Sequence, residues 1–133
     1  MLRALSIFAA LFGAVCVLIA LAHIALGPSA IPGSVPVNAT MDSEDRFYAT
    51  LFLGFGIAMI WASRDLAARR HVFLALMATF LAGGVARIIS AVMVGPPGDL
   101  FIFLGALELI IPPLSWWALR ESLRKLGEDA SRS

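Results

Sequence analysis

Hydrophobic residues fall in four long blocks along the chain, and short polar segments separate the blocks. A helix needs about 20 residues to cross a bilayer core of about 30 Å, and each block is close to this length. None of the blocks shows the short alternation of a half-buried strand. The pattern therefore predicts an all-α integral membrane protein, a four-helix bundle of two antiparallel helical hairpins. The predicted spans cover about residues 4–26, 46–62, 72–94 and 100–119.

Composition agrees with this class and excludes several functions. Of the 133 residues, 60% are hydrophobic and only 14% are charged. A soluble domain of this size would need more charge on its surface, so residues 1–133 are predicted to form a single membrane domain. The net charge of +1 gives no electrostatic basis for binding nucleic acid. Cys16 is the single cysteine, so an internal disulfide is excluded.

The distribution of lysine and arginine predicts the orientation of the helices. The chain has ten lysine and arginine residues, and eight of them lie before the first block, between the second and third blocks, or after the fourth block. Arg46 and Arg87 are the exceptions. The positive-inside rule places the segments rich in these residues in the cytoplasm. We therefore expect both termini in the cytoplasm (N-in/C-in), with residues 120–133 as a polar cytoplasmic tail. The first block is longer than a signal-peptide core, so we expect it to be retained.

One face of the first span carries small residues. Small side chains let two helices approach closely in a membrane, so this face should pack against another helix. The segment 27–40 that follows contains several prolines and glycines, which predicts a loop. Asp42 or Ser43 is expected to cap the second helix. The small-residue face contains, at heptad spacing, Ala9, Gly13, Cys16, Ala20, His23 and Gly27.

Two charged residues lie inside the third and fourth spans at similar depths. At about 1.5 Å per residue, Arg87 lies roughly 10 Å and Glu108 roughly 13 Å from the outer ends of their spans. A lone charge at the centre of a spanning helix costs about 2.5 to 3.5 kcal/mol, so these residues should either pair or face water. Because only a tight turn joins the two spans, pairing is geometrically easy.

Glycines and prolines accompany the charged pair along the chain. Gly83 and Gly84 lie about one turn before the arginine and leave room beside it. Pro112 and Pro113 follow the glutamate by about one turn. Because proline has no N–H group, the prolines leave two helix carbonyls without donors and predict a kink at the glutamate. These four residues are predicted to shape the site structurally.

The first two spans each add one ionisable residue, His23 and Arg46, near their outer ends. All four helices would thus contribute to one cluster in the outer half of the membrane. We predict that Arg87, Glu108, His23 and Arg46 form a ligand-binding pocket open to the outer face. In this pocket, Arg87 would grip an anionic group and Glu108 would orient it or exchange a proton. The alternative is that Arg87 and Glu108 only clamp two helices together.

Four short motifs occur along the chain: His-x-x-x-Gly-Pro at the end of the first span, Arg-Phe after an acidic segment, Gly-Gly-x-x-Arg in the third span, and a glutamate before Pro-Pro. With these motifs the chain resembles a bacterial family of small four-span membrane proteins, the domain-of-unknown-function 4345 family. The resemblance covers most of the chain and implies a four-helix membrane fold, but it implies no reaction. For a bacterial protein of this class, we expect a multi-pass protein of the cytoplasmic (inner) membrane. The matching positions are His23, Gly27, Arg46, Phe47, Gly83, Gly84, Arg87 and Glu108.

The function that we favour from the sequence is binding of a small amphiphile or lipid-like ligand. One alternative is a non-catalytic accessory or structural subunit of a larger membrane complex. A small proton-coupled transporter is another, because transporters build sites at broken helices. The last alternative is a membrane enzyme that uses Glu108 as acid or base together with His23.

No metal-ligand spacing, nucleophile motif or phosphate loop supports an enzyme. We therefore expect no catalytic residue, no metal and no cofactor. The expected partners are the lipid bilayer, a small amphiphile, and either a membrane protein complex or further copies of the chain. Nucleic acid is not expected.

Overall fold

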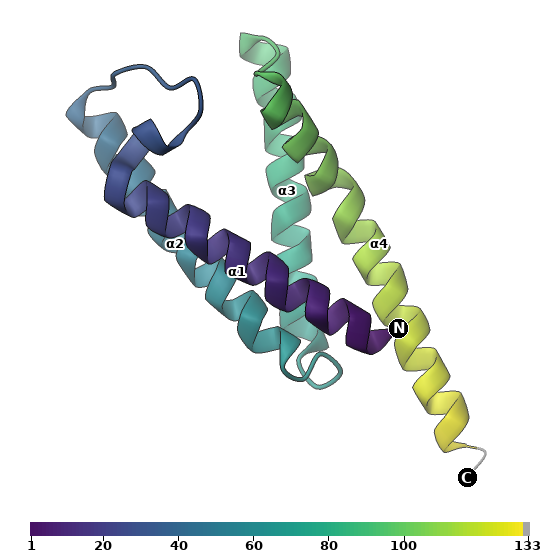
Figure 1. The fold of residues 1–133 in the computed structure, drawn as a ribbon. Helices are drawn as coiled ribbons and strands as arrows, with labels where there is room; N and C mark the ends of the chain where they lie inside the picture. The colour runs from purple at the N-terminus through teal and green to yellow at the C-terminus, as the bar shows by residue number, and fades with distance from the viewer. Residues whose placement is uncertain (132–133) are drawn as a thin grey trace. The chain divides into compact units, whose positions relative to one another are not determined.

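The computed structural model describes residues 1–131, which form four long helices (Figure 1). Among these residues there is no strand, and each of the four long helices is long and apolar enough to cross a membrane. The predicted all-α membrane class is therefore confirmed. In chain order the elements are α1 (Leu2–Leu26), the 3₁₀ helix η1 (Gly27–Ala30), α2 (Ala39–Ser63), α3 (Arg70–Val94) and α4 (Asp99–Ala130).

The chain divides into two compact units, which are described separately below. One unit comprises residues 6–65 and contains the hairpin of α1 and α2. The other comprises residues 66 onward together with residues 1–5, and it contains the hairpin of α3 and α4. The predicted pairing of the helices into two consecutive hairpins is therefore observed.

The α1–α2 hairpin is held together by a close approach of two glycines. A Cβ atom on Gly13 would lie 2.7 Å from the backbone oxygen of Gly56, and a Cβ atom on Gly56 would lie 2.8 Å from the oxygen of Gly13. Any larger residue at either position would force the helices apart. The small-residue face predicted for α1 is the packed face, since Ala9, Cys16 and Ala20 are buried beside Gly13.

Helix α2 begins earlier than the predicted span, and its cap differs from the predicted one. Asn38 is the N-cap: its backbone is extended, and its Oδ1 accepts a hydrogen bond of 2.9 Å from the N–H of Met41. The expectation that Asp42 or Ser43 caps the helix was wrong. Asp42 instead lies in the first turn, where its negative charge complements the helix dipole.

The α3–α4 hairpin also packs through glycines, but here each glycine faces a long side chain. A Cβ atom on Gly84 would lie 2.9 Å from Cδ2 of Leu109 and 3.0 Å from Cβ of Glu108. On the opposite helix, a Cβ atom on Gly105 would lie 3.4 Å from Cδ of Arg87. Each glycine thus makes the space that a residue of the other helix fills.

Helix α4 continues through both prolines and through most of the predicted polar tail. Pro112 and Pro113 lie inside the helix, and the helix extends to Ala130. Ion pairs between neighbouring turns support this extension, because Arg124 bonds Glu121 at 2.7 Å and Glu128 at 2.7 Å. Arg132, one of the basic residues used to predict orientation, lies outside the described residues.

Candidate functional site

The centre of the α3–α4 hairpin contains an ion pair between Arg87 and Glu108. The Nε atom of Arg87 donates to both carboxylate oxygens of Glu108, at 2.9 and 2.8 Å. The Glu108 side chain is 11% exposed, whereas the Arg87 side chain is 40% exposed. The pairing that the sequence suggested is therefore present, and the arginine is the more accessible partner.

The two helices position this pair through their glycines. Gly84 lies against the Cβ atom of Glu108, and Gly105 lies against the aliphatic stem of Arg87. Gly83 leaves more room, because a Cβ atom there would lie 3.7 Å from Oε2 of Glu108. Of the two neighbouring glycines, Gly84 thus makes the closer contact, and no pattern in the sequence singled out Gly105.

The guanidinium group of Arg87 is only partly used by its contacts with the protein. Its Nε atom donates to the carboxylate of Glu108, and its Cζ atom lies 5.8 Å from the ring centroid of Phe101. The Nη1 and Nη2 atoms make no hydrogen bond with residues 1–131. These two nitrogens form the second edge of the guanidinium, which has the geometry to bind two oxygens of one anion.

This guanidinium borders a hollow of about 260 Å³ near the turn end of the hairpin. Arg87 is its only ionisable lining residue, and the other lining residues are glycine, proline and apolar side chains of α3, α4 and their turn. A second hollow of about 400 Å³ lies toward the other end of the hairpin and has an entirely apolar lining that includes Pro112, Pro113 and Trp116. The hairpin therefore combines a positive group with adjoining apolar space.

The two prolines of α4 affect the backbone next to the pair. Pro112 and Pro113 cannot donate to the carbonyls of Glu108 and Leu109, the residues one turn before them. The helix nevertheless continues without interruption on both sides. Their direct contribution to the site is that both prolines line the apolar hollow.

The other two predicted site residues, His23 and Arg46, are bonded within the α1–α2 hairpin. The Nδ1 atom of His23 lies 3.1 Å from a carboxylate oxygen of Asp45. Arg46 bonds Asp42 through Nε at 2.9 Å and through Nη2 at 3.1 Å. Its Nη1 atom donates to the carbonyl oxygen of Ile24, in the last turn of α1.

Arg46 therefore closes the end of α1. The last carbonyls of a helix have no intrahelical donor, and a basic side chain can satisfy them. Gly27 makes this approach feasible, because it has φ 62° and its ideal Cβ position lies against the Asp42 carboxylate and 3.0 Å from Nη2 of Arg46. All three nitrogens of the Arg46 guanidinium are used, in contrast to those of Arg87.

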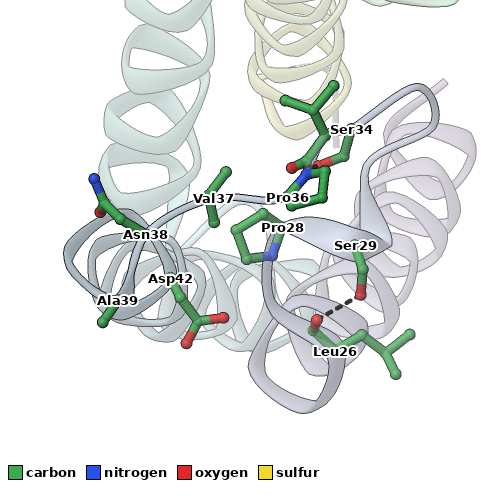
Figure 2. A pocket seen from close by; sticks show the side chains of 10 residues that line it. Leu26, Pro28, Ser29, Ser34, Pro36, Val37, Asn38, Ala39 and Asp42 are labelled. Carbon is green, nitrogen blue, oxygen red and sulfur yellow. Dashed lines mark hydrogen bonds between the residues drawn. The ribbon is translucent and has the colours of Figure 1, made fainter.

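A further hollow, of about 550 Å³, lies beside the loop that connects η1 to α2 (Figure 2). Its polar side chains already have partners in the protein: Ser29 donates to the carbonyl of Leu26 at 2.6 Å, Asn38 caps α2, and Asp42 bonds Arg46. Pro28, Pro36 and Val37 supply much of the remaining lining. This hollow offers no unpaired charged group to a ligand.

The structure thus brings the predicted site residues together in two sets. Arg87 pairs with Glu108 in one hairpin, while His23 and Arg46 each pair with an aspartate in the other. The prediction that all four residues form one cluster stays a prediction. Asp42 could have been recognised from its four-residue spacing to Arg46, a spacing that places ion pairs on one helix face. Nothing in the sequence singled out Asp45 or Phe101.

The Arg87–Glu108 pair joins a guanidinium to a carboxylate. The described residues contain no group of three or more His, Cys, Asp or Glu side chains that could hold a metal ion. Within residues 1–131, no serine, threonine or cysteine bonds the Arg87–Glu108 pair. The carboxylate of Glu108 fixes the position of the Arg87 guanidinium.

Comparison with known proteins agrees with the membrane architecture. Neither the curated proteins nor the solved structures include a match to this chain. A family model described as a domain of unknown function (DUF4345) matches residues 4–119. This match extends from the start of α1 through the membrane-spanning part of α4 and includes the ion pair of the second hairpin. The chain therefore belongs to the DUF4345 family, whose members share a domain of unknown function.

Proposed function

We propose that this multi-pass membrane protein binds an amphiphile with an anionic head, using the α3–α4 hairpin. Arg87 binds the head through Nη1 and Nη2, and Glu108 holds Arg87 in place. The neighbouring apolar hollows accommodate the hydrocarbon part of the ligand. The outward-facing position of the site, in the outer half of the membrane, follows from the positive-inside rule and is part of the proposal.

The observation that carries this proposal is the unbonded edge of a fixed guanidinium. Glu108 engages only Nε, so the N–H groups of Nη1 and Nη2 that point along the outer edge stay available to a ligand. Bidentate binding of an anion by a guanidinium is stronger and more specific than a single hydrogen bond. The burial of Glu108 and the stacking of Arg87 near Phe101 reduce the entropy that the side chain would lose on binding.

In a lipid environment, the head group of the ligand should determine the selectivity of binding. Hydrocarbon in the membrane is as apolar as the hollows, so transfer of a tail into them gains only packing contacts. A charge interaction is stronger in a medium of low dielectric than in water. Selectivity is therefore expected to come from Arg87, and neutral amphiphiles should not be retained.

The test is to purify the protein in a mild detergent and to identify its bound lipids by mass spectrometry. The wild type should retain an anionic species that is depleted at least about tenfold in Arg87→Gln, because hydrogen bonds to charged groups contribute about 1.5 to 3 kcal/mol. Arg124→Gln is the matched control. It removes one positive charge from α4, where Arg124 pairs with Glu121 and Glu128 and lines neither hollow of the hairpin. Equal lipid content in the wild type and Arg87→Gln would contradict the proposal.

A second candidate function is that of a non-catalytic structural subunit of a membrane assembly. The reciprocal packing of Gly84 against Glu108 and of Gly105 against Arg87 favours it, because this packing locks the hairpin without any ligand. In that case Arg87→Gln would lower the thermal stability but leave the lipid profile unchanged. The same preparation therefore distinguishes the two functions.

A further inference from the structure

We infer that the occupant of the α3–α4 hairpin is a single-chain fatty carboxylate, whose tail lies along one groove from Arg87 to Trp116. This inference rests on the proposed function and names the class of its ligand. It depends on three observations: the alignment of the two hollows, the length of the groove, and the number of donors left on Arg87.

The two hollows lie on the same side of the hairpin. On α3, Met77 lines one hollow, and Gly84, seven residues later, lines the other. On α4, Leu109 and Trp116 are related in the same way. Positions seven residues apart lie on one face of a helix after nearly two full turns. The hollows therefore follow one another along one side of the hairpin, and in this inference they are the two sections of one groove between the helices.

The length of this groove is close to the length of an acyl chain of a membrane lipid. The stem of Arg87 lies level with Gly105, because these residues are in contact. From Gly105 to Trp116, α4 rises about 16 Å at about 1.5 Å per residue. The hydrocarbon core of a bilayer is about 30 Å thick, so an acyl chain of one leaflet extends about half of that distance. A membrane acyl chain with its head at Arg87 would thus end near Trp116.

The arrangement of the sections favours one chain over two. The sections follow one another along the helices and do not lie side by side, as their lining residues occupy successive turns. Close packing between Gly84 and Leu109 keeps the helices together where the sections meet. A lipid with two parallel tails would leave one tail outside the groove.

The head is assigned from the charge and the donors at Arg87. Glu108 already balances one positive charge, so a monoanion adds less repulsion than a dianionic phosphate. A carboxylate presents two oxygens, and the unbonded guanidinium edge presents two nitrogens with parallel N–H groups. The section lined by Pro112, Pro113 and Trp116 is called the inner section below. No ionisable residue among the described residues lines it, so it suits the methyl end of the acyl chain.

The inference is tested by mapping where the tail lies. The probe is a palmitate analogue with a diazirine near its methyl end, added to the full-length protein in phosphatidylcholine nanodiscs. Illumination should attach it to the inner section, within 74–81 of α3 or 112–116 of α4, and peptide mass spectrometry locates the adduct. Ala78→Phe places a ring in that section and should lower the labelling there at least fivefold. Ala75→Phe, on the same helix but outside the lining, is the control and should leave the labelling unchanged.

The outcomes separate this inference from the function on which it rests. If Arg87→Gln leaves the retention of palmitate unchanged, the fatty carboxylate is overturned, and the proposed function also fails if the co-purifying anionic lipid is unchanged in the same variant. If the retention depends on Arg87 but the adducts are spread over the whole lipid-facing surface, the groove is wrong and the proposed function stands. Unlabelled palmitate should compete at least about tenfold better than dipalmitoyl phosphatidate. Equal competition by the two-chain lipid would overturn the assignment of a single chain.

Discussion

At the scale of single residues, the two arginines Arg46 and Arg87 differ in how many of their nitrogens the protein uses. Arg46 bonds a carboxylate of its own helix and the carbonyls at the end of α1. These contacts satisfy the helix end and account for the residue without a ligand. Arg87 bonds one carboxylate through Nε and keeps its outer edge unbonded. This difference is the reason that the proposed function places the anion at Arg87 and not at Arg46.

A double-mutant cycle at the ion pair should show strong coupling. Arg87→Gln or Glu108→Gln alone leaves one charge without its partner, so each single change should destabilise more than the double change does. The expected coupling free energy is about 1 to 3 kcal/mol, measured by unfolding in mixed micelles. The control cycle uses Glu121 and Arg124, which form an exposed pair in the last part of α4 and should couple by less than about 1 kcal/mol. Similar coupling free energies in both cycles would contradict the expectation that the Arg87–Glu108 pair is coupled more strongly than an exposed pair.

The neighbouring glycines Gly83 and Gly84 should respond differently to alanine. Gly84→Ala brings a methyl group within 2.9 Å of Cδ2 of Leu109 and 3.0 Å of Cβ of Glu108, so the Leu109 side chain or the helices must shift, at a cost of about 1 to 3 kcal/mol. Gly83→Ala meets only an ordinary contact of 3.7 Å and should change the free energy of unfolding by less than about 0.5 kcal/mol. Thermal unfolding of the two variants in the same detergent compares them directly. Equal losses would show that the close packing is not the cause.

At the scale of elements, both hairpins depend on small residues where their helices come closest. In the first hairpin two glycines face each other, so backbone lies against backbone. In the second hairpin each glycine faces a long side chain of the other helix, and the ion pair occupies the space. Because membrane helices gain little from burying apolar surface, such packing contacts supply much of their association energy.

Two glycines of α2 provide a test of this packing. Gly56→Ala would place a methyl group 2.8 Å from the oxygen of Gly13, so the hairpin should lose about 1 to 3 kcal/mol of stability. Gly54→Ala has nothing within 4 Å of the new atom and should be neutral or slightly stabilising, since alanine favours helix by about 1 kcal/mol over glycine. Unfolding in mixed micelles measures both variants. A loss for Gly54→Ala as large as that for Gly56→Ala would exclude the close contact as the reason.

At the scale of the whole molecule, the charges along the chain are asymmetric. The segment between α2 and α3 contains Arg64 and Arg69, α3 begins with Arg70, and further basic residues follow residue 119 of α4. The segment between α1 and α2 and the turn between α3 and α4 contain no lysine or arginine. This asymmetry is the basis for the prediction that both termini are cytoplasmic.

Labelling of cysteines introduced one at a time tests this orientation. Ser34→Cys, in the loop before α2, should react with a membrane-impermeant maleimide in intact cells. Ser131→Cys, after α4, should react only after the membrane has been permeabilised. The unmodified protein is the control, because Cys16 is 2% exposed and should not react. The reverse pattern of labelling would contradict the N-in/C-in prediction.

The sequence by itself determined the membrane class of the protein and its four long helices, and it made the pairing of Arg87 with Glu108 one of two expected outcomes. Hydropathy and block length depend on residues close together in the chain, and matching depth allows two charges to meet across a short turn. The cap at Asn38 was also a local feature, but the acidic residues that follow it suggested the wrong start for α2.

Only the tertiary structure decided which partners the remaining polar residues have. The pairing of His23 with Asp45, the closing of α1 by Arg46, and the contact of Gly105 with Arg87 join residues about twenty positions apart. These contacts depend on the rotation of each helix about its axis and on side-chain rotamers, and residue spacing alone does not specify either. The same geometry left the Nη1 and Nη2 edge of Arg87 unbonded beside the apolar groove, and on that edge the proposed function rests.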